Sequence, residues 1–170
     1  MLTIRAAENK DFTRIIALVA TVLDELGMEL DPDGIDADLS DIEGNYVAAG
    51  GLFVILQDEQ GEIAGTAGLM RINERQCELR KMYFLPEVRG QGWGESLMDF
   101  LIDSAGRLGF DEIYLETNNT FQAAIGLYLK VGFEPKERSA SCDVRCDRAF
   151  FLGLANYRRP AGLRELNMAP

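Results

Sequence analysis

A glycine-rich segment at residues 89–96, Arg-Gly-Gln-Gly-Trp-Gly-Glu-Ser, stands between an apolar run and an amphipathic stretch. The glycines at positions 90, 92 and 94 let the backbone adopt positive φ and approach a ligand closely. If a helix begins here, its first free N–H groups and its partial positive charge form an anion site, to which Arg89 adds a full charge. The pattern predicts a phosphate or pyrophosphate ligand.

Two common phosphate-binding motifs do not fit this segment. GxGxxG fails because position 95 is Glu, and a GxxxxGK[ST] P-loop occurs nowhere in the chain. The alternative is a plain turn that connects a strand to a helix. Three glycines within five residues make a segment harder to order, so we favour the anion site.

The sequence contains no histidine, which narrows the available chemistry. Ser-His-Asp and Cys-His nucleophiles, an imidazole base and zinc sites that use histidine are excluded, and we expect no metal. The catalytic groups near neutral pH must then be carboxylates, tyrosine, serine, cysteine or backbone amides. Cys77, Cys142 and Cys146 form no CxxC pair, so we expect reduced thiols of a cytoplasmic protein. A dithiol switch between Cys142 and Cys146 is the less favoured alternative.

Composition limits the partners. The chain has 170 residues, 28 acidic against 17 basic side chains and a net charge of −11, with 47% hydrophobic residues, as in an ordinary globular protein. The negative charge argues against nucleic acid and anionic membrane as partners, and it is compatible with cationic substrates such as amines. The longest apolar run, residues 15–23, is too short to cross a bilayer, and the N-terminus has no signal-peptide pattern.

The elements that would position these groups follow an unusual order. We expect strands at 2–5, 52–57, 62–70, 77–85 and 113–116, and two more within 133–154. We expect helices from the N-cap Asn9 to Gly27, around 35–42, at 92–108 and at 124–131. The order β-α-α-β-β-β-α-β-α-β-β predicts a mixed α/β fold whose central, mostly antiparallel sheet has helices on both faces. We expect one domain over residues 1–155 and a loosely attached tail over 156–170.

Two motifs lie on either side of the strand expected at 113–116. The first is Arg89-x-x-Gly92-x-Gly94 after a strand that ends in Phe84-x-Pro86, and the second is Leu127-Tyr128-x-Lys130-x-Gly132-Phe133. Together they resemble the signatures of the GNAT superfamily of N-acetyltransferases, and the order of elements agrees over roughly residues 2–154. The resemblance implies a three-layer fold. It also implies an enzyme that transfers an acetyl group from acetyl-CoA, its co-substrate, to a primary amine of a small amine, an amino acid or a protein.

The resemblance also implies where acetyl-CoA binds. Its pantetheine arm would pair with the strand before the loop, at Met82, Tyr83 and Phe84. Its pyrophosphate would lie on the loop and the first helical turn, at Arg89, Gly90, Gln91, Gly92, Trp93, Gly94 and Glu95, while Lys130 would either reach the phosphate end or be a solvated charge. The family often has asparagine where this chain has Phe121, and we expect Asn118 or Asn119 to take over that contact.

Acyl transfer to an amine needs a base, oxyanion donors and an acid. The resemblance implies that Tyr128, in contact with the cofactor, protonates the leaving thiolate, and that a strand N–H at Phe84 stabilises the oxyanion. The alternative for Tyr128 is a core tyrosine. Glu78 aligns with the general base of some histone-acetylating members, and period-two alternation places it on the same face as Phe84. The alternatives are an ion pair of Glu78 with Arg80 or Arg75, and water chains as the base.

The segment between the first two helices would wall the acceptor pocket. Its five acidic residues fit a cationic amine, although a solvated acidic loop is the commoner meaning of such a run: Glu29, Asp31, Asp33, Asp36 and Asp38. Cys77 lacks a histidine to activate it, so direct attack in a ternary complex is favoured over an acyl-enzyme. The rival function is a non-catalytic acyl-CoA-binding regulatory or sensor module. The final hairpin and the tail offer surfaces for a homodimer.

Overall fold

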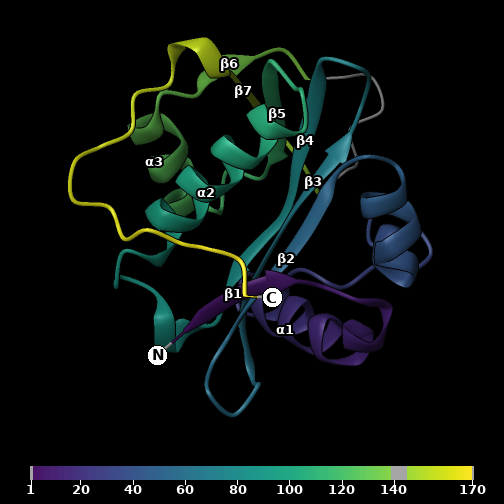
Figure 1. Ribbon diagram of the computed structural model, residues 1–170. Helices are drawn as coiled ribbons and strands as arrows, with labels where there is room; N and C mark the ends of the chain where they lie inside the picture. The colour runs from purple at the N-terminus through teal and green to yellow at the C-terminus, as the bar shows by residue number, and fades with distance from the viewer. Residues whose placement is uncertain (1, 139–144, 170) are drawn as a thin grey trace.

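A seven-stranded sheet forms the centre of the molecule in the computed structural model, which describes residues 2–138 and 145–169 (Figure 1). The strands are β1 (Thr3–Ala6), β2 (Leu52–Gln57), β3 (Ile63–Arg71), β4 (Gln76–Phe84), β5 (Glu112–Thr117), β6 (Glu134–Lys136) and β7 (Arg148–Gly153). Their order across the sheet is β1-β2-β3-β4-β5-β7-β6, and the neighbouring pairs are antiparallel except for β4 and β5. The predicted mixed, mostly antiparallel sheet is confirmed.

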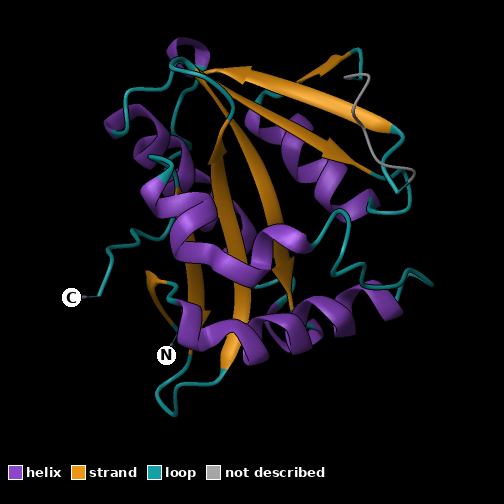
Figure 2. Ribbon diagram, turned by 90° about the vertical axis from the view of Figure 1, so that its right-hand side faces the viewer, coloured by secondary structure: helices purple, strands orange, loops and turns teal. Residues whose placement is uncertain are grey.

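Helices cover both faces of the sheet and give three layers (Figures 1 and 2). The α-helices are α1 (Phe12–Asp24), α2 (Trp93–Arg107) and α3 (Gln122–Val131), and the short helical turns are η1 (Asn9–Asp11), η2 (Ala37–Asp41), η3 (Glu43–Ala48), η4 (Pro86–Val88) and η5 (Leu154–Asn156). One hydrophobic core lies between the sheet and α2 and α3, and the other lies under α1, η2 and η3. None of the helices in the described residues is long and apolar enough to cross a membrane.

The helix expected around residues 35–42 is irregular. The 3₁₀ turn η2 is followed by η3, which is a π-helix. The Asp41 carboxylate accepts a hydrogen bond from the Gly44 N–H at 2.9 Å, and such local bonds compete with an α-helical ladder. Asn9 does not cap α1 as expected. Its side-chain amide instead donates to Asp41 and accepts from the Glu43 N–H, which ties the start of α1 to this irregular segment.

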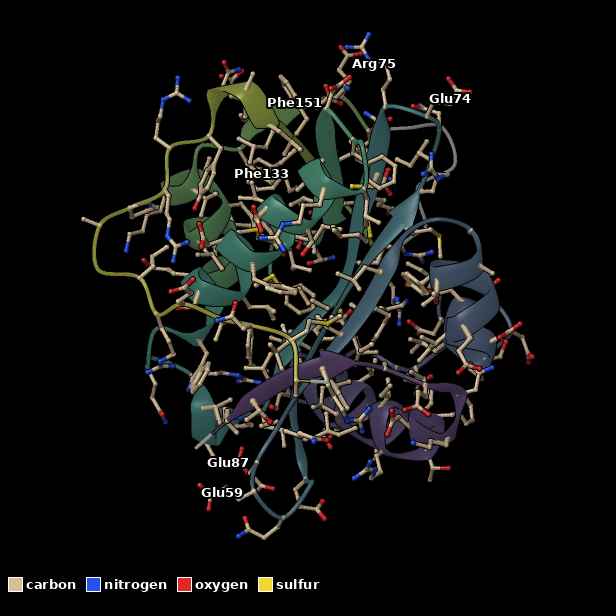
Figure 3. The ribbon with its side chains drawn as sticks, in the orientation of Figure 1. Glu59, Glu74, Arg75, Glu87, Phe133 and Phe151 are labelled. Atoms are coloured by element: carbon tan, nitrogen blue, oxygen red, sulfur yellow. The ribbon has the colours of Figure 1, made fainter. Side chains whose placement is uncertain are left out.

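Aromatic packing fixes α3 against the sheet. The ring of Tyr128, on α3, lies 5.7 Å from the ring of Phe133 and 6.2 Å from the ring of Phe150 on β7. Figure 3 shows Phe133 inside the layer between the sheet and the helices, where it is buried. The predicted Gly132 stop of α3 is confirmed, with φ of +108°. These two aromatic contacts therefore fix the position of the Tyr128 ring.

The C-terminal segment is anchored, so the expectation of a loosely attached tail is wrong. The Tyr157 hydroxyl donates to the Asp99 carboxylate at 2.9 Å, and the Arg164 guanidinium lies 3.8 Å from the centre of the Trp93 ring. Near the end, the Ala169 N–H donates to a carbonyl of β1. Figure 1 shows the tail in yellow, passing along the side of α2 and ending beside β1.

Candidate active site

β4 and β5 run side by side for only three residue pairs and then separate. The last of these pairs joins Glu78 to Tyr114. Beyond it, β4 continues to Phe84 along β3, and no other strand of the described residues pairs with its edge toward β5. An unpaired strand edge is a site where an extended ligand can add as a further strand. Met82, Tyr83 and Phe84 all lie on this stretch, where the pantetheine arm was expected.

A bulge in β4 lies at the same place. Gly68 of β3 pairs with Arg80 and Thr66 pairs with Tyr83, so β4 carries one extra residue between these pairs. Lys81, in the bulge, has φ of +55°, which is unusual for a residue other than glycine. The strand is therefore locally strained where it leaves β5.

A buried ion pair holds the bulge. The Lys81 side chain is 4% exposed, and its ammonium lies 2.5 Å from the Asp36 carboxylate and 2.9 Å from the Ile35 carbonyl. Arg145, which precedes β7, binds the same carboxylate at 3.0 Å and the Glu29 carbonyl at 2.7 Å. Asp36 thus joins three segments: the loop before η2, the bulge of β4 and the start of β7.

The bulge also corrects the expected position of Glu78. Phe84 packs against the core under α2 and α3, whereas Tyr83 packs with the core under α1. Glu78 lies 4.0 Å from Arg80, whose guanidinium donates to the Ile35 carbonyl on the α1 side. Glu78 and Phe84 are therefore on opposite faces, and the alternation argument was wrong because one extra residue reverses the faces of a strand.

Two cavities adjoin where the strands separate. The larger cavity, of about 820 Å³, is lined by parts of β4 and β5, by Gly34 and Ile35, and by Arg145 and Cys146. The second cavity, of about 420 Å³ and here called the loop cavity, lies beside the glycine-rich segment. Five residues line both cavities: Met82, Tyr83, Phe121, Ala124 and Tyr128. Groups held in the two cavities would meet at this shared wall.

The glycine-rich loop has the backbone geometry of an anion site. Gly90 and Gly92 have φ of +72° and +82°, and a Cβ atom added to either would meet no protein atom within 4 Å. Gly92 is the N-cap of α2, so the helix begins at the wall of the loop cavity. Gly94 lines the same cavity in the first turn. Free N–H groups at a helix N-terminus favour negative charge, and the open space matches a bound anion.

The chain has relatives among known proteins in both sequence and fold. The sequence profile of the acetyltransferase (GNAT) family matches residues 5–133, which is more than half of the chain. This chain belongs to the GNAT family. Its sequence is 32% identical to the uncharacterised N-acetyltransferase YjgM of Escherichia coli over 145 residues, covering 82% of this chain and 84% of that protein. The predicted family and enzyme class, an acetyltransferase, are confirmed.

Two solved GNAT structures share the fold. An acetyltransferase of Staphylococcus aureus superposes with a TM-score of 0.85 at 26% identity, covering 91% of this chain and 99% of that one. The spermidine N-acetyltransferase of Vibrio cholerae superposes with a TM-score of 0.66 to 0.68 in several forms, one of them solved with CoA and spermine. For that complex, the TM-score is 0.68 at 22% identity, covering 92% of this chain and 97% of that one. The second likeness concerns the fold alone.

Charged residues around the glycine-rich loop form ion pairs within the protein. Arg89 forms a two-pronged salt bridge with Glu25, at 2.7 and 3.0 Å, and donates to the Phe84 carbonyl at 2.8 Å. The hydrogen bonds from Arg89 lower the pKa of the Glu25 carboxyl. Glu95 lines the loop cavity and binds Lys130 at 2.6 Å. A phosphate at the loop would therefore compete with Glu25 for the Arg89 guanidinium.

Three expected cofactor residues have side chains that do not line the loop cavity. The Trp93 ring is buried in the core, and the exposed Gln91 donates to the Glu87 carbonyl at 2.6 Å. Asn118 lines the larger cavity, and its amide donates to the Arg145 carbonyl at 2.8 Å and accepts from Thr120. The structure thus does not bring the Asn118 side chain to the glycine loop.

Tyr128 stands between the two cavities. The residue is 6% exposed, lines both cavities, and its hydroxyl has no hydrogen-bond partner within residues 2–138 and 145–169. Burial raises the pKa of Tyr128, and the nearby Tyr83 raises it further. A phenol with a raised pKa stays protonated near neutral pH, as a proton donor must be.

Glu78 lines the larger cavity with a side chain that is 25% exposed. Burial raises the pKa of Glu78, Arg80 partly opposes this, and the charge of Glu116 on β5 adds to the rise. A carboxylate with a raised pKa is a better general base near neutral pH. Of the two arginines expected as partners, Arg80 is near, whereas Arg75 pairs with Asp111 at 2.5 Å.

The acidic segment and the cysteines depart from expectation in different ways. None of the five acidic residues expected to face the acceptor lines the larger cavity. Asp36 and Asp38 are instead bound to cations, so that expectation was wrong. Burial raises the pKa of the Cys77 thiol to about 12, which agrees with its exclusion as a nucleophile. Cys146 lines the larger cavity, and Cys142 lies outside the described residues.

Replacing Asp36 with Asn should strongly destabilise the protein. The change leaves Lys81 and Arg145 without their shared carboxylate, and breaking such a buried pair costs about 3 kcal/mol in the free energy of unfolding. Chemical denaturation measures the loss. The exposed Asp33→Asn in the same loop is the matched control and should change little. A wild-type unfolding midpoint for Asp36→Asn would contradict the role of the pair.

The effect of Asp36→Asn should also depend on pH. Burial alone would raise the pKa of Asp36, but hydrogen bonds from Arg145 and Lys81 outweigh it and hold this pKa below its ordinary value. A lowered folded-state pKa adds stability above the unfolded-state pKa, about 3.9 for Asp, and this stability is lost as the pH falls through the folded-state value. The stability difference from wild type should therefore be largest near neutral pH and shrink below about pH 4.

Proposed function

We propose that this GNAT protein transfers an acetyl group from acetyl-CoA, in the loop cavity, to a primary amine in the larger cavity, by direct attack in a ternary complex. The observation that carries the proposal is the position of Tyr128, which lines both cavities and whose hydroxyl has no hydrogen-bond partner among the described residues. Release of free CoA thiol across a panel of amines tests it. Acetyl-CoA binding without turnover on any amine would favour the rival, a non-catalytic acyl-CoA-binding module.

The donor would follow the unpaired edge of β4 into the loop. Met82, Tyr83 and Phe84 offer backbone groups to the pantetheine arm, as a neighbouring strand would. The pyrophosphate would lie on the N–H groups of the loop at the start of α2, close to Arg89. This arrangement would bring the thioester to the shared wall, beside Tyr128.

The reaction then needs three proton movements, two from the nitrogen and one to the sulfur. A lysine-type amine has a pKa of about 10.4, so the acceptor must lose a proton before it attacks. Glu78 would take this proton, directly or through water, while the amine nitrogen bonds to the thioester carbon and a strand N–H at Phe84 binds the oxyanion. The attacking nitrogen would then lose its second proton to water, and as the C–S bond breaks, Tyr128 would give its proton to the CoA thiolate. Bulk water would restore both groups.

Gly92→Ala should abolish the thermal stabilisation by acetyl-CoA. A Cβ at position 92 has room in the protein but projects into the space where the phosphates would lie. At a hundredfold excess over its dissociation constant, a ligand adds about 2.7 kcal/mol of stability, which a melting curve detects readily.

Gly109→Ala is the matched control for this variant. Gly109 has φ of +88°, equally open surroundings and no part in either cavity, so it suffers the same backbone strain of roughly 1–2 kcal/mol. It should keep the full acetyl-CoA shift. Equal shifts in the two variants would place the phosphate site elsewhere.

Tyr128→Phe should lower kcat by about 10²- to 10⁴-fold and leave acetyl-CoA affinity nearly unchanged. The ring packing on Phe133 and Phe150 is retained, and only the proton donor is lost. Tyr157→Phe makes the same chemical change at a residue that lines neither cavity and should keep wild-type turnover. Steady-state kinetics with the acceptor found in the amine panel measure both. Wild-type turnover in Tyr128→Phe would mean that water protonates the thiolate.

Glu78→Gln should lose most activity near neutral pH and recover part of it at alkaline pH, where more acceptor is already neutral. In the wild type, kcat/KM should fall as the pH drops through the raised pKa of Glu78, because the base becomes protonated. This fall of kcat/KM at low pH should be absent in Glu78→Gln. Glu74→Gln, in the exposed β3–β4 turn labelled in Figure 3, is the control. If kcat/KM of Glu78→Gln still fell at low pH as in the wild type, the base would be another group.

A further inference from the structure

Arg80 stands between two carboxylates. Its guanidinium lies 3.5 Å from the carboxylate of Asp38 and 4.0 Å from that of Glu78, which is two residues earlier on β4. The guanidinium also donates to the Ile35 carbonyl at 2.9 Å and lies 3.5 Å from the Met70 sulfur. Asp38 and Ile35, in and just before η2, therefore hold this cation more closely than Glu78 does.

Asp38 is buried, although it lines neither cavity. Its side chain is 7% exposed, and the hydroxyl of Tyr46, on η3, donates to its Oδ2 atom. Burial and the charge of Asp38 raise the pKa of Tyr46, so this phenol keeps its proton and remains a donor. The Oδ1 atom lies 3.3 Å from the Lys81 ammonium and forms no hydrogen bond within residues 2–138 and 145–169. Because an isolated charge is costly to bury, Asp38 depends on Arg80 and Lys81 for its neutralisation.

The charges around Glu78 come from several elements. Burial is the largest cause of the raised pKa of Glu78. Arg80 and Lys81 on β4 lower this pKa, whereas Glu116 on β5 and Asp38 on η2 raise it further. Titratable side chains of other elements line the same cavity: Tyr114, Tyr128, Lys136, Glu137, Arg145 and Cys146. These six side chains are retained when Asp38 or Arg80 is replaced.

Asp38 affects Glu78 in two ways that act in the same direction. The negative charge of Asp38 disfavours the ionised form of Glu78 directly. Asp38 also binds Arg80, and a guanidinium that moved from Asp38 to Glu78 would favour the ionised form and make Glu78 a weaker base. Because Arg80 and Glu78 are already 4.0 Å apart, a short movement of the arginine side chain would be enough.

We propose that Asp38 is a positioning residue for acetyl transfer, which holds the Arg80 guanidinium away from Glu78 and so keeps Glu78 a strong enough base for the ammonium of the acceptor. Asp38 lines neither cavity and acts mainly through Arg80. The inference rests on the proposed function, in which Glu78 takes the proton. It explains how a carboxylate two residues from an arginine can still serve as the base.

Carbon-13 NMR of the Glu78 carboxyl group measures its titration without any ligand, and Glu78→Gln identifies the signal. Asp38→Asn should lower the titration midpoint of Glu78 by about one pH unit, as expected for a carboxylate that gains an arginine neighbour. Asp33→Asn removes the same charge from an exposed position of the preceding loop and should keep the wild-type midpoint. Equal midpoints in the two variants would overturn the role of Asp38.

The route through Arg80 is tested by combining substitutions. In Arg80→Gln the midpoint of Glu78 should rise, because a cation that lowers its pKa is lost. Adding Asp38→Asn to this variant should then lower the midpoint by less than Asp38→Asn does alone, since the two side chains act together. If the lowering were the same in both backgrounds, Asp38 would not act by positioning Arg80.

Tyr46→Phe tests the same proposal with every charge retained, and it decides the matter if Asp38→Asn does not fold. The ring contact with Phe53 is kept, while Asp38 loses a hydrogen-bond donor. Arg80 should then approach Asp38 more closely, and the midpoint of Glu78 should rise. An unchanged or lower midpoint in this variant contradicts the proposal. Chemical denaturation confirms that each variant is folded.

The pH dependence of kcat/KM connects Asp38 to the reaction. With the acceptor found in the amine panel, the fall of kcat/KM at low pH should move to lower pH in Asp38→Asn by the amount that NMR gives. On the alkaline side of this fall, kcat should be about 2- to 10-fold below that of the wild type, because a weaker base removes the proton less readily. A purely structural role would reduce activity without moving the midpoint.

The outcomes separate this inference from the proposed function. If amines are acetylated but the kcat/KM profile of Asp38→Asn has the same midpoint as that of Asp33→Asn, the inference fails and the acetyl transfer stands. If no amine is acetylated, the proposed function fails, and the positioning role fails with it even where the NMR midpoint moves. Matching shifts in the NMR titration and in the kinetic profile support both.

Discussion

The separation of β4 from β5 after three residue pairs is the constraint on which the rest of the molecule's chemistry depends. Had the two parallel strands stayed paired, the edge of β4 would be satisfied by β5, and neither cavity could reach Tyr128. The separation coincides with a bulge whose central residue, Lys81, has a strained backbone and a buried charge. Asp36 neutralises that charge, so a side chain from a distant loop helps to hold the strands apart.

The same ion network divides the carboxylates into two groups. Asp36 and Asp38 are bound to cations and act in the architecture, whereas Glu78 lines the larger cavity with Arg80 4.0 Å away. A buried carboxylate that is well paired has a lowered pKa, and one that is poorly paired has a raised pKa. The opposite shifts of Asp36 and Glu78 show this division within one small region.

The features that could be predicted from the sequence are those that depend on residues adjacent in the chain. The glycine loop, the start of α2 at Trp93 and the stop of α3 at Gly132 all depend on local conformational preferences, and all were found at or near their expected positions. The partnership of Arg89 with Glu25, 64 residues away, has no local signal. Neither has the bulge at Lys81, because alternation of side chains assumes that no residue is inserted.

The position of Glu116 at the larger cavity has no local signal either. On a short strand it resembles a half-exposed surface residue, and only the unequal lengths of the paired and unpaired parts of β4 and β5 bring it to the cavity. The tail was misjudged because its anchors are single contacts at irregular spacing, such as Arg164 on Trp93. Periodic patterns do not reveal contacts of this kind.

The separate walls of the two cavities bear on how such a protein diversifies. The loop cavity is built by the glycine loop, the end of α1 and α3, while Gly34, Ile35, Glu116 and Arg145 belong to the larger cavity alone. Substitutions at Gly34, Ile35 or Glu116 change the outline or charge of the larger cavity and leave the residues that line the loop cavity unchanged. New substrates can thus be acquired stepwise by a lineage of duplicated genes, each copy keeping its donor chemistry while its acceptor drifts.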